Sequence, residues 1–367
     1  MAENSFCGSY RPEDCVFLLK PISLESVSVE EKERLIQSGK RHYSQMITAE
    51  KAPSEAYLRL FDQAMDRNGD RLAQDLLVLA REMDRNMVGP ITLVSLARAG
   101  TPIGALLGRL LRSRFSRDCL HYSVSIVRDR GVDHNALAHI LRTGRPDTSV
   151  VFVDGWTGKG TISRELTESV SVFNGANGTR IDAGVWTVAD LSGSAAVSAT
   201  GEDYLVPSSI LNSTVSGLVS RTILHEDHVG PLDFHGCLHY RQFETIDRSN
   251  WFLDTIERRA TAISMDALPE PLRVDSARSS SLRDAMESML GNLAGRFPSA
   301  ANRHFVKPGI GESTRVLLRR VPQRLLLSEP EHPEAEHLRM LAREKNVPME
   351  IDPALPVKAV ALIRELD

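Results

Sequence analysis

Several features are scarce in this 367-residue sequence, and each absence excludes a class of protein. Aromatic residues make up only 5%, which disfavours a stacking surface for single-stranded nucleic acid. No apolar run approaches 18 residues, so no transmembrane helix is expected. The first ten residues lack the basic start and apolar stretch of a signal peptide. The four cysteines lie far apart and form no CxxC pair, which indicates neither a zinc module nor a disulfide framework: Cys7, Cys15, Cys119 and Cys237.

These absences predict a reduced, cytoplasmic protein. Apolar residues make up 42% and charged residues 25%, so a packed core is expected. The 44 Lys and Arg residues against 48 Asp and Glu residues give a formal charge of −4. This balance argues against a whole-chain polyanion binder, although it leaves room for a local basic patch.

A repeated order of strand, turn and helix in the middle of the chain predicts an α/β fold. The continuous apolar run at 91–96 is typical of a strand buried on both faces. We expect a parallel sheet with helices on both faces, and ligands beyond the carboxyl ends of its strands. The predicted elements are strands at 91–96, 121–127, 149–154 and 183–193, and helices at 102–115, 161–173 and, broken in two at Asn68-Gly69, 55–88.

The chain divides into three predicted parts: a large domain with an N-terminal extension over 1–262, a linker and connecting helix over 263–294, and a small α/β/α domain over 295–367. In the small domain the pattern predicts strands and helices in alternation: strands at 322–329 and 347–351, helices at 333–346 and 357–366.

The segment 151–161 carries the strongest chemical signal. A buried strand ends in Asp154, a loop rich in glycine and hydroxyls follows, and a helix begins at Thr161. Glycines let backbone N–H groups approach an anion, and the helix N-terminus and Lys159 add positive charge. We interpret this loop as a phosphate cradle beside a carboxylate; the alternative is a glycine-rich connector without a ligand. The spacing fits neither a Walker A loop nor a Rossmann fingerprint.

A second turn, at 97–101, also joins a strand to a helix. Its small residues permit close approach of the backbone to an anion, and Arg98 offers a forked contact. Taken alone, this segment is interpreted equally well as an ordinary turn without a ligand. Together, the two turns predict a site for a ligand with phosphate at each end and hydroxyls between.

On these residues the sequence resembles type I phosphoribosyltransferases. Gly100 and its neighbours match that family's diphosphate loop, and Asp154 with the run 157–161 matches its phosphoribosyl diphosphate motif. Gly155 stands where the family carries a second acid. The resemblance implies a type I phosphoribosyltransferase-like sheet and transfer of a phosphoribosyl group to or from a base-like acceptor. Mg²⁺ is expected with the substrate and not through direct protein ligands.

The strings VSLARAGTPIG (94–104), VFVDGWTGKG (151–160) and DFHG (233–236) narrow the resemblance to one family. It is the phosphoribosyltransferase-like family of bacterial tellurium-resistance and stress gene clusters, some of whose members are labelled StiP-type cysteine proteases. The resemblance covers about 6–260. Members of that family often carry a C-terminal Pelota-type RNA-binding domain.

The resemblance also implies roles for single residues. Asp154 is expected at the ribose hydroxyls, and Arg128 and Arg130 are expected as catalytic residues that close over the diphosphate, unless they form a solvated turn. The substrate-binding residues are expected to be Arg98, Ala99, Gly100, Thr101, Thr157, Gly158, Lys159, Gly160 and Thr161.

The C-terminal part resembles the Pelota and kink-turn-binding ribosomal protein superfamily through the run KPGIGESTRVLLRR (307–320). That superfamily meets RNA with a glycine-containing loop that opens a helix. The four-residue spacing of Arg315 and Arg319 places both on one helical face. The expected RNA-binding residues are Gly309, Gly311, Arg315, Arg319 and Arg320. The alternative is a solvated basic face on a dimerising or scaffolding domain, and a homo-oligomer is possible.

Two other functions stay open at this point. Gly155 in place of an acid favours a non-catalytic, nucleotide-sensing RNA-binding regulator. A cysteine protease is the remote alternative, with Cys237 or Cys7 as the nucleophile, because a thiol needs a histidine to activate it and His235 and His239 flank Cys237.

Overall fold

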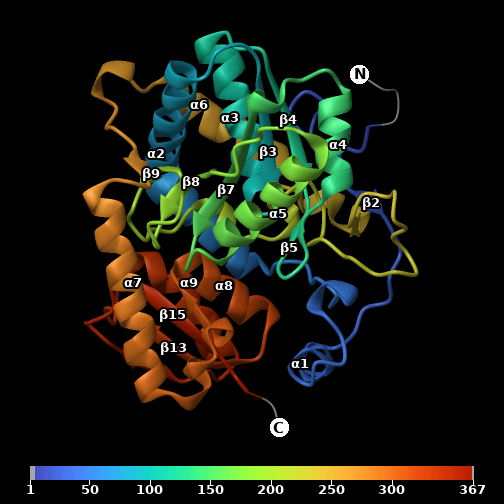
Figure 1. The fold of residues 1–367 in the computed structure, drawn as a ribbon. Helices are drawn as coiled ribbons and strands as arrows, with labels where there is room; N and C mark the ends of the chain where they lie inside the picture. The colour runs from blue at the N-terminus through green and yellow to red at the C-terminus, as the bar shows by residue number, and fades with distance from the viewer. Residues whose placement is uncertain (1–4, 366–367) are drawn as a thin grey trace.

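The computed structural model describes residues 5–365 and has an α/β architecture built on a mostly parallel central sheet (Figure 1). Only the last strand, β11, is antiparallel to its neighbour. The predicted α/β class and parallel sheet are confirmed, while the phosphoribosyltransferase type of this sheet stays a prediction. In spatial order the strands are β1 (Val16–Leu18), β4 (Cys119–Val124), β3 (Ile91–Leu96), β7 (Val150–Thr157), β8 (Val185–Asp190), β9 (Val197–Thr200) and β11 (Leu272–Arg273).

Helices cover both faces of this sheet, because its central strands carry apolar side chains on both sides. On β3, Leu93 packs into the cluster formed with α2, α3 and α6, and Val94 packs into the cluster formed with α4 and α5. The first face is covered by α2 (Glu55–Asn86), α3 (Gly100–Phe115) and α6 (Ser249–Thr261), and the second by α4 (His134–Arg142) and α5 (Thr161–Asn177).

A four-stranded sheet forms the C-terminal part of the described chain (Figure 1). Its strand order is β12 (Val306–Pro308), β15 (Ala359–Ile363), β13 (Pro322–Leu327) and β14 (Met349–Ile351), and it is accompanied by α7 (Ala277–Arg296), α8 (Ile310–Arg319) and α9 (Glu336–Glu344). The remaining elements are α1 (Val29–Gln37) and two small sheets, β2 (Lys20–Pro21) with β10 (Gly236–Cys237) and β5 (Ile126–Val127) with β6 (Gly131–Val132).

Two predictions about local structure are wrong. The apolar run predicted as a helix at 357–366 contains strand β15, whose five residues are all buried between β12 and β13. A short apolar run does not distinguish a strand from a buried helix by periodicity. The predicted break at Asn68-Gly69 is absent, since α2 is continuous there. Asn68 donates to the Leu205 carbonyl, and the guanidinium of Arg259 packs where Gly69 lacks a side chain.

The C-terminal unit is docked on the edge where the strands β7 to β9 end (Figure 1). Asp203, which follows β9, accepts the N–H of Ile310 at 3.0 Å and the N–H of Lys358 at 2.7 Å. A Cβ on Gly311 would overlap the indole of Trp156 at the end of β7, so glycine allows α8 to approach this strand closely. The docked unit therefore forms a wall beyond the carboxyl ends of the strands.

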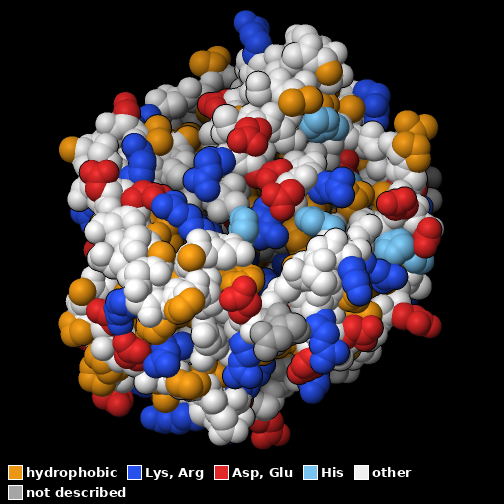
Figure 2. Space-filling view, turned by 60° about the horizontal axis from the view of Figure 1, so that its bottom comes forward, with side chains coloured by type: hydrophobic (Ala, Val, Ile, Leu, Met, Phe, Trp, Pro, Cys, Tyr) orange, Lys and Arg blue, Asp and Glu red, His pale blue; other side chains and the backbone are white. Residues whose placement is uncertain are grey.

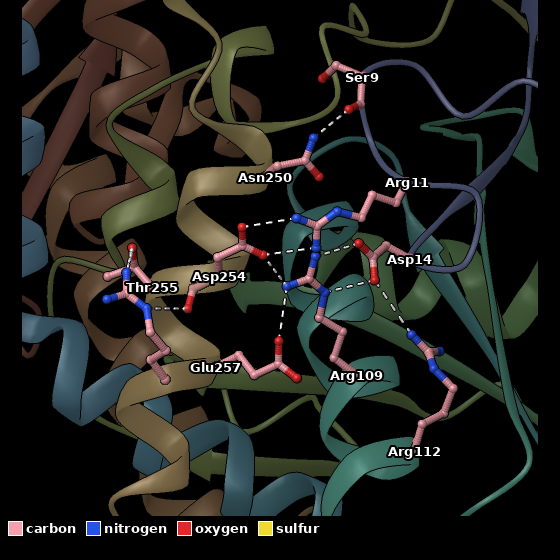
Figure 3. Close-up of polar contacts among 10 residues, drawn as sticks. Ser9, Arg11, Asp14, Arg109, Arg112, Asn250, Asp254, Thr255 and Glu257 are labelled. Atoms are coloured by element: carbon pink, nitrogen blue, oxygen red, sulfur yellow. Dashed lines mark hydrogen bonds and ion pairs between the residues drawn. The ribbon is translucent and has the colours of Figure 1, made fainter.

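A buried ion-pair network anchors the N-terminal segment on the opposite side of the fold (Figure 3). Arg109 of α3 is 6% exposed and binds Asp14, which is 2% exposed, through two hydrogen bonds of 2.8 and 2.6 Å. Arg109 also reaches Asp254 at 2.7 Å and Glu257 at 3.1 Å on α6. Arg11 binds the same Asp254 from the exposed side. One guanidinium thus joins the N-terminal segment, α3 and α6.

We expect Arg109→Met to lower the free energy of unfolding by about 3–5 kcal/mol, because it removes both hydrogen bonds to the buried Asp14 carboxylate and leaves only the ion pair with Arg112 at 3.6 Å. The matched control, Arg11→Met, removes an exposed partner of Asp254 and is expected to cost less than about 1 kcal/mol. Urea denaturation of the two variants beside the parent measures both. Equal losses in the two variants would contradict the structural role given to Arg109.

Candidate functional site

A cavity of about 1010 Å³ lies between the carboxyl end of β7 and helix α8. Asp154, Trp156 and the loop 157–163 form one wall, and α8 contributes the opposite wall through Arg315 and Arg319. A third wall comes from the segment 47–54. Figure 2 shows Lys, Arg and His side chains gathered around the hollow in this face of the molecule. The cavity therefore lies where ligands bind in open parallel sheets.

The structure brings the two predicted anion-binding turns together at the ends of neighbouring strands, β3 and β7. Arg98, Asp154 and the whole loop 157–161 line the cavity. Ala99, Gly100 and Thr101 do not line it. Gly100 packs directly against the backbone of Asp154, where a side chain would not fit. The first turn thus packs against the second, and only its Arg98 reaches the cavity.

Several of the polar groups in these turns already hold protein partners. The Thr157 hydroxyl donates to Asp190. Lys159 donates to the carbonyl oxygens of Arg303 and Val306, the latter at 2.8 Å. Arg98 binds Glu50 at 2.8 Å and the Val219 carbonyl at 3.0 Å. Binding roles for these residues stay predictions.

The predicted catalytic arginines both line a second, smaller hollow beside His42, and one of them also reaches the cavity. Arg128 lines the cavity, and its guanidinium lies over the ring of Tyr43 at 5.3 Å from the centroid. Arg130 lines only that smaller hollow. The structure therefore places one of the two in the cavity that Asp154 also lines, and their catalytic role stays a prediction.

The predicted RNA-binding residues face the rest of the chain. Gly309 is buried against Leu191. Arg315 binds Glu312 at 2.6 Å and lies over the Trp156 ring at 4.7 Å. Arg319 donates to Asn212, and Arg320 binds Glu33. Through these contacts the basic side chains point into the cavity and not outward. RNA binding itself stays a prediction.

Positive charge accumulates in the cavity although the whole chain has a formal charge of −4. Eleven Lys and Arg side chains and five Asp and Glu side chains line it. Burial lowers the pKa of Lys32 to about 7, with Arg221 adding to the effect, and burial also lowers the pKa of Lys159 to about 7. The sequence reasoning missed Lys32, since it lies in a segment without a motif and joins the site only through the fold.

The thiols lie outside this cavity, and three of the four are buried. Burial raises the pKa of Cys237 and of Cys119 to about 12, and it also raises the pKa of Cys15 well above its usual value. Cys7 is the partly exposed thiol, and it donates to the Ser5 carbonyl at 3.4 Å. Burial and the charge of Glu13 raise its pKa.

A histidine lies close to the Cys7 segment. The ring of His239 packs edge-on against Phe6, with the ring centroids 5.3 Å apart. Burial and Arg241 lower the pKa of His239, so its imidazole is neutral at pH 7. The backbone on either side of Cys7 is fixed, because Phe17 donates to the Phe6 carbonyl at 2.7 Å and Ser9 donates to the Gly217 carbonyl at 3.0 Å. Within residues 5–365, no hydrogen bond joins a thiol to an imidazole.

Comparison with known proteins assigns the chain to a family. A family model described as "Tellurite-like stress resistance cysteine protease StiP" matches residues 8–257. The chain belongs to the StiP family. It is 38% identical over 379 aligned positions to a protein of Acinetobacter baylyi named "Cysteine protease StiP", and the match covers 99% of this chain and 96% of that protein. A model described as "PELOTA RNA binding domain" matches residues 289–365.

These matches correct the main functional prediction. The expected phosphoribosyltransferase, with its phosphoribosyl diphosphate substrate, is wrong, because both the StiP-family model and the Acinetobacter baylyi relative carry the name of a cysteine protease. The predicted glycosyltransferase class of enzyme is wrong for the same reason. The resemblance to the StiP and Pelota families is confirmed.

The described residues hold neither a helix suited to span a membrane nor a cluster of metal-ligating side chains. No helix within 5–365 combines the length and apolarity needed to cross a bilayer. The same residues contain no group of three or more His, Cys, Asp or Glu side chains placed to hold a metal ion. Mg²⁺ carried by a phosphate ligand, and a homo-oligomer, stay predictions.

Asp154 gives a testable pH dependence. Burial raises its pKa to about 7, and Arg315 and the Gly155 N–H, which donates to it at 2.7 Å, oppose the shift. In the unfolded chain a carboxyl ionises near pH 4, so between pH 4 and 7 the folded state holds a proton that the unfolded state releases. The contribution of Asp154 to stability therefore falls as the pH rises through this window.

We expect Asp154→Asn, which keeps the acceptor for Gly155 and has no ionisable group, to gain stability relative to the parent between pH 4.5 and pH 8. The expected gain is about 3 kcal/mol, from urea denaturation at both values. Asp275→Asn, at an exposed position, serves as the control and should give no comparable gain. A constant difference between Asp154→Asn and the parent at both pH values would contradict the raised pKa of Asp154.

Proposed function

We propose that this protein is a cysteine peptidase whose nucleophile is Cys7. The family match and the name of the Acinetobacter baylyi relative support the class of enzyme. The observation that carries the choice of residue is exposure, because Cys7 is partly exposed while the other three thiols are buried. A substrate must reach the sulfur, and a thiol in an apolar core resists ionisation.

His239 is the residue we propose as the general base. Its ring packs on the residue that precedes Cys7, and it is neutral at pH 7, as acceptance of a thiol proton requires. Glu244 lies within electrostatic reach and favours the protonated form of His239. In free enzymes the catalytic hydrogen bonds are often long and shorten only when substrate binds, so we expect the Cys7–His239 contact to form in the complex.

The proposed reaction proceeds in two steps. The Cys7 sulfur gives its proton to His239 and attacks the carbonyl carbon of the peptide bond, which forms a thioester and breaks the C–N bond. The amine leaves with the proton from His239. Water then attacks the thioester carbon, releases the carboxylate product and restores the thiol.

RNA binding by the C-terminal unit is a second candidate function, favoured by the Pelota-domain match over 289–365. The basic residues of α8 are the proposed contacts, namely Arg315, Arg319 and Arg320. Because these side chains face the cavity, RNA would have to reach them there.

We expect Cys7→Ala to lower kcat/KM for peptide cleavage by about 10³-fold or more, since removal of a nucleophile leaves only binding and electrostatic contributions. The measurement uses the full chain and a panel of internally quenched fluorogenic peptides. Labelling with iodoacetamide, read by mass spectrometry of the labelled peptides, should modify Cys7 before the buried thiols.

Cys237→Ala is the control, because Cys237 is the other thiol with neighbouring histidines and is fully buried. It is expected to retain cleavage. Loss of activity in Cys237→Ala with retention in Cys7→Ala would move the nucleophile to Cys237. Full activity in both variants would contradict the peptidase mechanism.

A further inference from the structure

The basic end of α8 contacts side chains of the large unit, residues 5–262, and does not face the outside of the molecule. Arg320 binds Glu33 of α1 through both its Nε and Nη2 groups, the second at 2.8 Å, and Glu33 is completely buried. Arg319 donates to the side-chain oxygen of Asn212. A forked guanidinium contact to two oxygens is also the way in which arginine binds a phosphate group. Glu33 therefore offers Arg320 the same contact as a phosphate.

An aromatic ring of the large unit covers the preceding basic residue of α8. The guanidinium of Arg315 lies over the Trp156 ring, 4.7 Å from its centroid. Gly311, one turn earlier in the helix, lies against the same indole. Arginine also stacks in this way on the flat faces of unpaired RNA bases. Trp156 thus offers Arg315 the same contact as a base.

A carboxylate of the large unit lies at the start of the same helix. Asp203 accepts the N–H of Ile310 at 3.0 Å, directly after Gly309. A helix N-terminus is a common binding place for phosphate, because its first N–H groups are free and the helix dipole is positive there. Asp203 is therefore a further group of the large unit that lies where an anion would bind.

Together, these contacts cover the face of α8 that is proposed to bind RNA. The start of the helix, Arg315, Arg319 and Arg320 each meet the large unit, which supplies two carboxylates, an amide and an indole. These groups resemble phosphates and bases in charge and shape. A face that they already occupy cannot hold RNA at the same time.

We propose that this arrangement is autoinhibited: the large unit imitates RNA on the face of α8, and RNA binds only after the C-terminal unit has moved away from the strand ends and opened the cavity. This regulation rests on the proposed RNA-binding function of the C-terminal unit. Apolar contacts make the closed form dominant without RNA, since Ile310 and Val316 of α8 belong to the same buried cluster as Ile210. The observed RNA affinity is then the intrinsic affinity reduced by the small fraction of open molecules.

Two variants that break the same ion pair, Glu33→Gln and Arg320→Gln, test the proposal. Both weaken docking, but only Glu33→Gln leaves the RNA-binding face intact. We expect Glu33→Gln to bind RNA at least about 5-fold more tightly than the parent, because more molecules are open. We expect Arg320→Gln to bind at least about 5-fold more weakly than Glu33→Gln, because it also loses a charged contact to RNA. The measurement is the fluorescence anisotropy of a short labelled RNA hairpin with the full chain at about 0.15 M salt.

Two further variants separate docking from charge. Trp156→Leu weakens docking without a change of charge, and it should bind RNA at least about 3-fold more tightly than the parent. Glu226→Gln removes a negative charge at an exposed position that does not line the cavity, and it should leave the RNA affinity unchanged. A cooperative thermal unfolding transition identifies the variants that remain folded.

Hydrogen–deuterium exchange of the parent detects the movement itself. With saturating RNA we expect faster exchange in α1 and at 157–163, because the unit that covers these segments has moved away. Slower exchange at 157–163 would mean that RNA enters the closed cavity.

Four results would overturn the autoinhibition while RNA binding itself stands: equal affinity of the parent, Glu33→Gln and Trp156→Leu, equal tightening in Glu226→Gln, equal affinity of Arg320→Gln and Glu33→Gln, or slower exchange at 157–163 in the complex. No RNA binding by the parent or by any variant would instead reject the RNA-binding function, and the autoinhibition with it. The proposed peptide cleavage is independent of these outcomes, because no cysteine lines the cavity.

Discussion

A single carboxylate, Asp203, accepts the backbone N–H groups at the start of α8 and just before β15, and so fixes the C-terminal unit over the ends of the parallel strands. The negative charge also lies at the N-terminus of α8, where the helix dipole favours it. Burial raises the pKa of Asp203 to about 6, against the effect of its N–H donors. Beside it, Gly311 lets α8 lie directly on Trp156. Docking at these two points determines which side chains meet in the cavity.

This docking explains why the molecule has two chemically distinct regions. The carboxyl ends of β3 and β7 and the basic face of α8 enclose a positively charged cavity, while Cys7 lies on the N-terminal segment that Arg109 anchors to α3 and α6. The name of the matching family supports the thiol chemistry proposed at Cys7, whereas an excess of Lys and Arg side chains characterises the cavity. The two regions share no residue, so a variant in one leaves the side chains of the other unchanged.

Local sequence patterns predicted the central α/β unit well. The buried strand at 91–96, the strand that leads to Asp154 and the helix from Thr161 are present, because apolar runs and glycine-rich turns act locally. Strand β15 was missed, since only pairing on both sides distinguishes its apolar run from a helix. Lys32 was missed because it reaches the cavity from a segment far along the chain from the glycine-rich turns. The function was wrongly predicted because glycine-rich turns of this kind indicate an anion site and not a reaction.

Hydrogen–deuterium exchange of a Gly311→Leu variant tests the docking most directly, because a side chain there must displace Trp156 or α8. Gly291→Leu is the control, since Gly291 is exposed in α7 with open space around it. The account predicts faster exchange at 157–163 and 310–320 in the Gly311 variant alone, with β3 still protected. Unchanged protection of both segments in that variant would contradict the close approach of α8 to β7.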